Sequence, residues 1–155
     1  GKGYTYGAQT TFDVRKFRGP FVASADVRNA VTDSAITEVL YELERIRKEP
    51  VTPEELDMVK RFIVGSFPLQ IETPNQIASK VIDLELYDLP RDFYDTFNDH
   101  VERIGAQDIL RVAQAYLHPD RVAIVVSGNS KEITPKLQKF GPLEVVEADG
   151  KPIAR

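Results

Sequence analysis

The hydrophobic period of this chain changes near residue 30, and that change limits the folds it can adopt. Before it, the side chains that would share one face recur at every second position, in two runs: Tyr4, Tyr6, Ala8, Thr10, Phe12 and Val14, then Phe21, Ala23, Ala25 and Val27. A period of two is typical of a half-buried strand. The short gap from Arg15 to Pro20 suits antiparallel pairing. We therefore expect a hairpin from about Tyr4 to Arg28.

From Asp33 the period is 3.6, which predicts an amphipathic helix to about Lys48. Two start signals follow, Thr52-Pro53-Glu54-Glu55 and Thr73-Pro74-Asn75-Gln76. Each places a hydroxyl at the N-cap, proline at the first helical position and Glu or Gln at the third. They predict helices over 56–67 and from 73 past 84. Further helices are expected over 90–104, around 109–116 and over 133–140.

The run from Arg121 to Ser127 contains Val-Ala-Ile-Val-Val, which predicts a strand buried on both faces in the interior of a sheet. Leu143 to Val146 is expected to form a last edge strand, and the tail over 150–155 to be frayed. Two strands precede five helices, so the sequence predicts an α+β fold, with an antiparallel-rich sheet and helices packed on one face. We expect one domain over residues 1–149.

Composition excludes several classes of function. The 24 acidic and 20 basic residues give a net charge of −4 without runs of one sign, so no nucleic acid or anionic membrane surface is an expected partner. No stretch reaches the length of a membrane span, and residues 1–20 do not resemble a signal peptide. The absence of cysteine fits either redox compartment, so localisation stays open.

Side chains for metal binding or nucleophilic catalysis are poorly placed in this sequence. The two histidines, His100 and His118, are eighteen positions apart, whereas zincin helices need two imidazoles at i and i+4. No serine lies in a Gly-x-Ser-x-Gly elbow. Gly128-Asn129-Ser130 lacks the lysine and further glycines of a phosphate loop and is expected to be a tight turn with a serine cap. We expect no metal site and no cofactor in this chain.

The segment Gly3-Tyr4-Thr5-Tyr6-Gly7 is the strongest candidate for ligand contact. Two phenols flanked by glycines at the start of a strand can donate hydrogen bonds to a ligand beside open backbone. Core packing of both rings against the face of Phe12 is the alternative. Because Tyr6 alternates in step with Phe12, a regular strand would favour packing, and a bulge near Gly7 would redirect the ring.

Several stretches in order resemble the insulinase (pitrilysin-type) zinc peptidase family, in its bacterial and mitochondrial-processing-peptidase-like branch. The stretches are Gly3 to Gly7, Phe21-Val22-Ala23-Ser24-Ala25-Asp26-Val27, Phe67-Pro68-Leu69 before Thr73 to Ala78, and Tyr116-Leu117-His118-Pro119-Asp120-Arg121. In that family two half-domains of similar fold enclose a chamber, and the first half carries the zinc site. This chain resembles the second, C-terminal half.

The resemblance implies a substrate-positioning, non-zinc half of a metalloendopeptidase, inactive alone. Its expected partners are a zinc half-domain, in the same chain or as a separate subunit, and a peptide substrate. Tyr6 matches a family tyrosine that reaches the substrate backbone, with Tyr4 as a second substrate-binding residue, while the paired arginine would lie seven positions earlier, before Gly1. The alternative is a non-catalytic core or partner subunit. Bacterial relatives favour an exported location.

Overall fold

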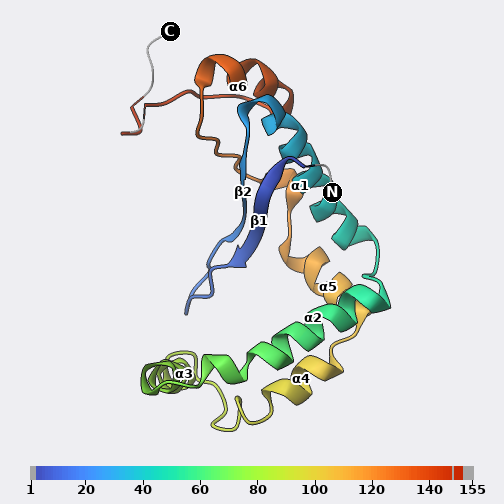
Figure 1. The fold of residues 1–155 in the computed structure, drawn as a ribbon, viewed down its shortest axis with the longest axis vertical. Coiled ribbons are helices and arrows are strands. Elements are labelled where there is room, and N and C mark those ends of the chain that lie inside the picture. The colour runs from blue at the N-terminus through green and yellow to red at the C-terminus, as the bar shows by residue number, and fades with distance from the viewer. Residues whose placement is uncertain (1–2, 148, 152–155) are drawn as a thin grey trace. The chain divides into compact units, whose positions relative to one another are not determined.

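The structure is a computed structural model that describes residues 3–147 and 149–151, except for the side chain of Tyr6. The described residues form two strands and six helices, which Figure 1 labels: β1 (Thr5–Phe12), β2 (Phe21–Val27), α1 (Thr32–Lys48), α2 (Pro53–Ser66), α3 (Pro74–Leu86), α4 (Phe97–Arg103), α5 (Ala106–Tyr116) and α6 (Ser130–Leu137). Four short 3-10 turns join them: η1 (Asn29–Val31), η2 (Pro68–Gln70), η3 (Pro119–Arg121) and η4 (Gln138–Phe140). The predicted α+β class is confirmed.

Contacts group the chain into two compact units. Within the described residues, the first contains residues 3–12, Phe21–Leu43, 118–147 and 149–151, and the second contains Asp13–Pro20 and Glu44–Leu117. Helix α1 therefore begins in the first unit and ends in the second. Among the described helices, none is long and apolar enough to span a bilayer.

The first unit contains the hairpin predicted from the sequence. Strands β1 and β2 pair antiparallel, with Phe12 opposite Phe21 and Thr10 opposite Ala23. The Phe12 and Phe21 rings lie 4.8 Å apart, which is a favourable cross-strand aromatic distance. The first strand ends at Phe12 rather than at Val14.

Two lysines join α6 and the turn η4 after it to the turn η1 and the first residues of α1. Lys136 Nζ donates to the carbonyl oxygens of Asn29, at 3.2 Å, and Ala30, at 2.8 Å. Lys139 Nζ donates to Asp33 Oδ2 at 2.8 Å. Ile133 and Leu137, on α6, are buried.

The predicted strand over Arg121–Ser127 is wrong. Residues 122–127 have no regular secondary structure, and Val125 is 92% exposed. An apolar run of this kind becomes a buried strand when neighbouring strands pair with its edges and other layers cover its faces. The residues that the structure describes place no strand beside it. The predicted edge strand over 143–146 is reduced to an isolated bridge at Val146.

The second unit is organised around an aromatic cluster between α2 and α4. Phe67, at the end of α2, is buried, and its ring lies 4.7 Å from Phe97 and 6.1 Å from Tyr94. Lys60 Nζ on α2 donates to the carbonyl of Glu102 on α4 at 2.6 Å. Val101, Ala113 and Leu117 complete the buried apolar set of this unit among the described residues.

Both predicted Thr-Pro caps are confirmed. At α2, Glu55 N–H donates to Thr52 Oγ1 at 3.2 Å and Thr52 N–H donates to Glu55 Oε2 at 2.9 Å. Thr73 and Gln76 repeat the reciprocal pair at α3. The Thr52 amide holds the pKa of Glu55 below its ordinary value, because that hydrogen bond favours the carboxylate.

Two other predicted helix starts are corrected. The fourth helix begins at Phe97, and turns occupy residues 91–95, where the Pro90 signal predicted helix. Asn129, rather than Ser130, caps α6, because its side-chain oxygen accepts from Lys131 N–H at 3.2 Å. Asparagine and serine are about equally good caps, so sequence alone does not separate them.

Candidate functional site

The candidate segment Gly3–Gly7 contains a β-bulge. Thr5 pairs with Val27 and Ala8 pairs with Ala25, so Tyr6 and Gly7 together lie opposite one residue, Asp26. A bulge of this kind bends the strand, changes the direction of nearby side chains, and is common beside active sites. The bulge considered from the sequence is therefore present.

The bulge changes which residues of β1 share a face. Thr5 pairs with Val27 and thus lies on the face of Ala8 and Phe12, although its number is odd. The even-numbered alternation that linked Tyr6 to Phe12 is broken at this point. The argument for Tyr6 as a core residue, which rested on that alternation, loses its basis.

The hydroxyl of Thr5 stabilises the bulge through hydrogen bonds. Thr5 Oγ1 accepts from Gly7 N–H at 3.0 Å and donates to the Gly7 carbonyl at 2.5 Å. One side chain therefore satisfies both backbone groups of a bulge residue. Upstream, Gly3 has φ 67°, a left-handed conformation that glycine adopts without strain. The bulge is held by local contacts.

The two predicted site tyrosines lie on either side of Thr5. Tyr4 immediately precedes β1 and is half-buried, and Tyr6 is within β1 at the bulge. The side chain of Tyr6 lies outside the described part of the structure, so its predicted contact with substrate stays a prediction. The backbone brings both positions to the end of the hairpin where β1 starts.

The two faces of the hairpin differ in chemistry. On β2, Phe21, Ala23 and Val27 are half-buried, whereas Val22, Ser24 and Asp26 are exposed. On β1, Gln9 pairs with Ser24 and extends this exposed polar face. The strands read TYGAQTTF and FVASADV, so Asp26 supplies their one charged side chain. Sequence reasoning did not single out Asp26, although a lone charge within two strands is a usable signal.

Among the described tyrosines, Tyr94 is the one with a clearly shifted pKa. Its contacts hold elements of the fold together. Burial raises that pKa, and the Asp83 carboxylate, which accepts from Tyr94 Oη at 3.3 Å, raises it further. Lys80 Nζ lies 5.4 Å from the ring centroid. Because the phenol stays protonated and lies in the aromatic cluster, it links α3 to that cluster rather than exchanging protons.

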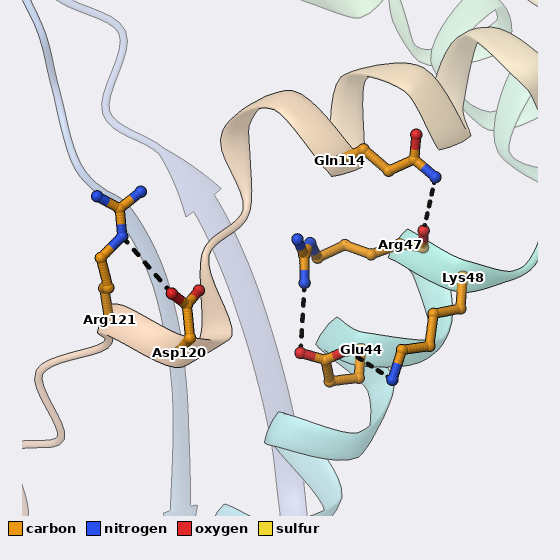
Figure 2. A network of polar contacts seen from close by, with 6 residues as sticks. All are labelled: Glu44, Arg47, Lys48, Gln114, Asp120 and Arg121. Carbon is orange, nitrogen blue, oxygen red and sulfur yellow. Dashed lines mark hydrogen bonds and ion pairs between the residues drawn. The ribbon is translucent and has the colours of Figure 1, made fainter.

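Figure 2 shows a polar network on helix surfaces. Near the end of α1, the Glu44 carboxylate pairs with Arg47 at 3.3 Å and Lys48 at 3.0 Å. Gln114 Nε2 on α5 donates to the Arg47 carbonyl at 3.0 Å. Asp120 and Arg121 pair with each other at 3.8 Å. These are neighbouring pairs and a helix-end contact, which stabilise local structure rather than form a site.

The His, Asp and Glu side chains were compared with the arrangement that a zinc site needs. Within residues 3–147 and 149–151, no three His, Asp or Glu side chains gather closely enough to hold a metal ion. His100 lies near the end of α4, and His118 precedes the turn η3.

Comparison with known proteins agrees with the resemblance seen in the sequence. Residues 1–63 match the family model described as the peptidase M16 inactive domain. No curated protein matches the chain. The chain is also similar to a crystal structure of the peptidase M16 inactive domain from Pseudomonas fluorescens, with a TM-score of 0.70 and 23% identity over 77% of this chain. It spans 28% of that solved chain.

These comparisons confirm that the chain resembles the second, inactive half-domain of the insulinase, or M16, peptidases. The sequence match is confined to the hairpin, α1 and most of α2. The likeness over the rest of the covered chain is one of fold.

Proposed function

We propose that this chain, which carries the M16 inactive-domain pattern in residues 1–63, is the substrate-positioning half of a zinc endopeptidase. In this proposal it completes the peptide-binding chamber of a zinc half-domain and does not hydrolyse peptides alone. The observation that carries the proposal is the family match across a hairpin whose first strand is bulged at Tyr6–Gly7.

The proposed chemistry of this half is hydrogen bonding to the peptide. A phenol held on a braced strand can donate to a substrate carbonyl and continue to donate as negative charge develops on that oxygen. Zinc and the attacking water belong to the partner half in this scheme, since the described residues of this chain do not fit a metal. We assign the donor to Tyr6, with Tyr4 contacting the substrate beside it.

The first test is Tyr6→Phe in the protein that contains this chain and a zinc half-domain. We expect turnover to fall by about 10²–10³-fold with zinc content unchanged, the typical effect of removing one oxyanion donor. Tyr116→Phe is the matched control, because Tyr116 is an exposed phenol on α5, 67% accessible, and its loss should leave turnover unchanged.

Two other outcomes decide against parts of the proposal. Near-full turnover of Tyr6→Phe would remove Tyr6 from the site. An assembly that contains no zinc half and cleaves no peptide would instead assign the chain to a structural core or partner role.

A further inference from the structure

The loop between β1 and β2 differs in charge from the chain as a whole. Residues 13–20 read DVRKFRGP, so three cations, Arg15, Lys16 and Arg18, stand against one carboxylate. The whole chain, in contrast, has a net charge of −4. The net charge, from which no anionic membrane partner is expected, averages over this local excess. The loop is therefore a separate candidate for contact with an anionic surface.

Exposed apolar side chains accompany the cations of this loop. Val14 is 70% exposed and Phe17 is 85% exposed. All of the residues over 14–20 are exposed, and Phe17 stands between Lys16 and Arg18. Segments that lie in a membrane interface combine an aromatic ring with neighbouring Lys or Arg in this way, because the ring leaves water while the long cationic side chains stay among the lipid headgroups.

Hydrogen bonds at the base of the loop hold its backbone. Asp13 N–H donates to the Pro20 carbonyl at 3.0 Å, which closes the loop. Arg15 Nε donates to Asp13 Oδ2 at 2.8 Å. The hydroxyl of Tyr87, the residue that follows α3, donates to the Val14 carbonyl at 3.2 Å. The base of the loop is thus tied both to itself and to the end of α3.

The side chains of the loop tip, defined as Lys16, Phe17 and Arg18, take no part in those contacts. With the other residues that the structure describes, neither Lys16 nor Arg18 forms a hydrogen bond or an ion pair. Binding through the tip therefore breaks no contact of the described fold. Because the base is already ordered, less conformational entropy is lost on binding than for a free segment.

The small size of the tip separates a lipid surface from a protein surface. A stable protein interface buries about 800 Å² on each partner, from about 20–30 residues a side, which three side chains do not provide. A membrane surface accepts a single inserted ring, and each Lys or Arg near an anionic leaflet adds to the attraction. The exposed ring and the excess of positive charge together favour anionic lipid.

We propose that the loop over residues 13–20 binds an anionic membrane surface. Phe17 enters the boundary between headgroups and acyl chains, and Lys16 and Arg18 pair with lipid phosphates. One ring and a few cations give reversible binding, because stable anchoring needs two stronger signals. The inference goes beyond the proposed peptidase role and does not depend on it.

The test is co-sedimentation of the protein that contains this chain with two kinds of vesicle. One kind is phosphatidylcholine alone, and the other is equal parts of phosphatidylcholine and phosphatidylglycerol. We expect binding to the anionic vesicles, weakened by salt. Lys16→Gln combined with Arg18→Gln should lower the partition coefficient about thirtyfold, since each cation contributes about fivefold. Phe17→Ser should lower it about tenfold.

A fluorescent variant tests insertion of the ring directly. This chain contains no tryptophan, so Phe17→Trp places a new fluorophore at the tip. On anionic vesicles its emission, relative to the wild-type protein, should shift to shorter wavelength and be quenched by lipids with brominated acyl chains. Phe62→Trp is the control, because Phe62 is a 73% exposed ring on α2, and its emission should not change.

A matched charge control separates the loop from the overall charge. Arg61→Gln combined with Lys131→Gln removes two exposed cations outside the loop, so it changes the net charge by the same amount. This variant should keep most of the vesicle binding. The urea midpoint of every variant should equal that of the wild type, because the tip side chains make none of the contacts at the base of the loop.

Three results would overturn the proposal: no binding to anionic vesicles, equal binding to both kinds of vesicle, or equal losses in the tip variant and the charge control. Binding to polyglutamate without binding to vesicles would also overturn it, and would assign the loop to an acidic protein surface instead. Peptide turnover measured without lipid decides the peptidase proposal, so either proposal can fail alone.

Discussion

Backbone crowding decides which residue can occupy position 19. A Cβ built on Gly19 would lie 1.7 Å from the carbonyl oxygen of Asp13 and 2.9 Å from its carbonyl carbon. The same loop is closed by Asp13 N–H donating to the Pro20 carbonyl at 3.0 Å. The glycine is therefore required by the close approach of two backbone segments, which the pattern Arg-Gly-Pro in the sequence does not reveal.

Gly19→Ala should destabilise the protein by about 1–3 kcal/mol, because backbone atoms must move apart to admit the methyl group. Gly65→Ala is the opposite control. A Cβ at Gly65, within α2, meets nothing within 4 Å, so alanine should stabilise by about 0.5–1 kcal/mol through helix propensity. Urea unfolding of both variants measures the difference, and equal effects would contradict the described loop geometry.

At the scale of single elements, the ends of α3 show how much of the fold is local. Its start is the reciprocal Thr73 and Gln76 cap, and Gln76 Nε2 also donates to the Leu69 carbonyl at 3.0 Å. Its C-terminal end has the left-handed cap that usually contains glycine, but Asp88 occupies that position. Leu89 N–H donates to the Leu84 carbonyl at 2.9 Å, and Asp88 between them has φ 54°. That is the left-handed position where glycine is usual.

Asp88→Gly should therefore stabilise the protein, by about 0.5–1 kcal/mol, since glycine adopts the left-handed conformation without a steric penalty. Thermal or urea unfolding measures it. Glu85→Gly, three residues earlier inside the helix, should destabilise by about 1 kcal/mol for the opposite reason. Destabilisation by Asp88→Gly would show that the aspartate side chain contributes more than its backbone strain costs.

At the scale of the whole molecule, contacts between distant parts of the chain carry the organisation of each unit. In the first unit, Lys136 and Lys139 bind residues 106 and 107 positions away in sequence. The lysines differ in their acceptors. Lys136 binds backbone carbonyls, which do not titrate, whereas Lys139 binds the Asp33 carboxylate. This difference makes one contact sensitive to pH and leaves the other insensitive.

The hydrogen bond from Lys139 holds the pKa of Asp33 below its ordinary value of about 3.9. Because the folded pKa is lowered, the contribution of this pair is complete above that value and is lost as pH falls through the folded pKa. We expect Lys139→Gln to lower the urea midpoint at pH 7 and to have no effect once Asp33 is protonated. Lys136→Gln should lower the midpoint at both pH values. A pH-independent effect of Lys139→Gln would contradict the pairing.

The sequence by itself determined the local elements of this protein. Strand period, Thr-Pro capping boxes and helical stripes depend on neighbours within about four residues, so the hairpin, α1, α2 and α3 were predicted with nearly correct bounds. The family resemblance was predicted as well, because it rests on motifs in order along the chain. The α4 start and the α6 cap were missed, since several residues nearby could serve equally well.

Tertiary structure decided what depends on pairing between distant residues. Whether 121–127 forms a strand depends on neighbouring strands rather than on its own Val-Ala-Ile-Val-Val, and Val125 is left exposed. The register of β1 against β2 set the bulge at Tyr6–Gly7 and brought Asp26 opposite it. Periodicity could name Tyr6 as a candidate. One extra residue in a strand, however, changes the face on which each residue beyond it lies, and the hydrophobic pattern of the sequence does not contain that information.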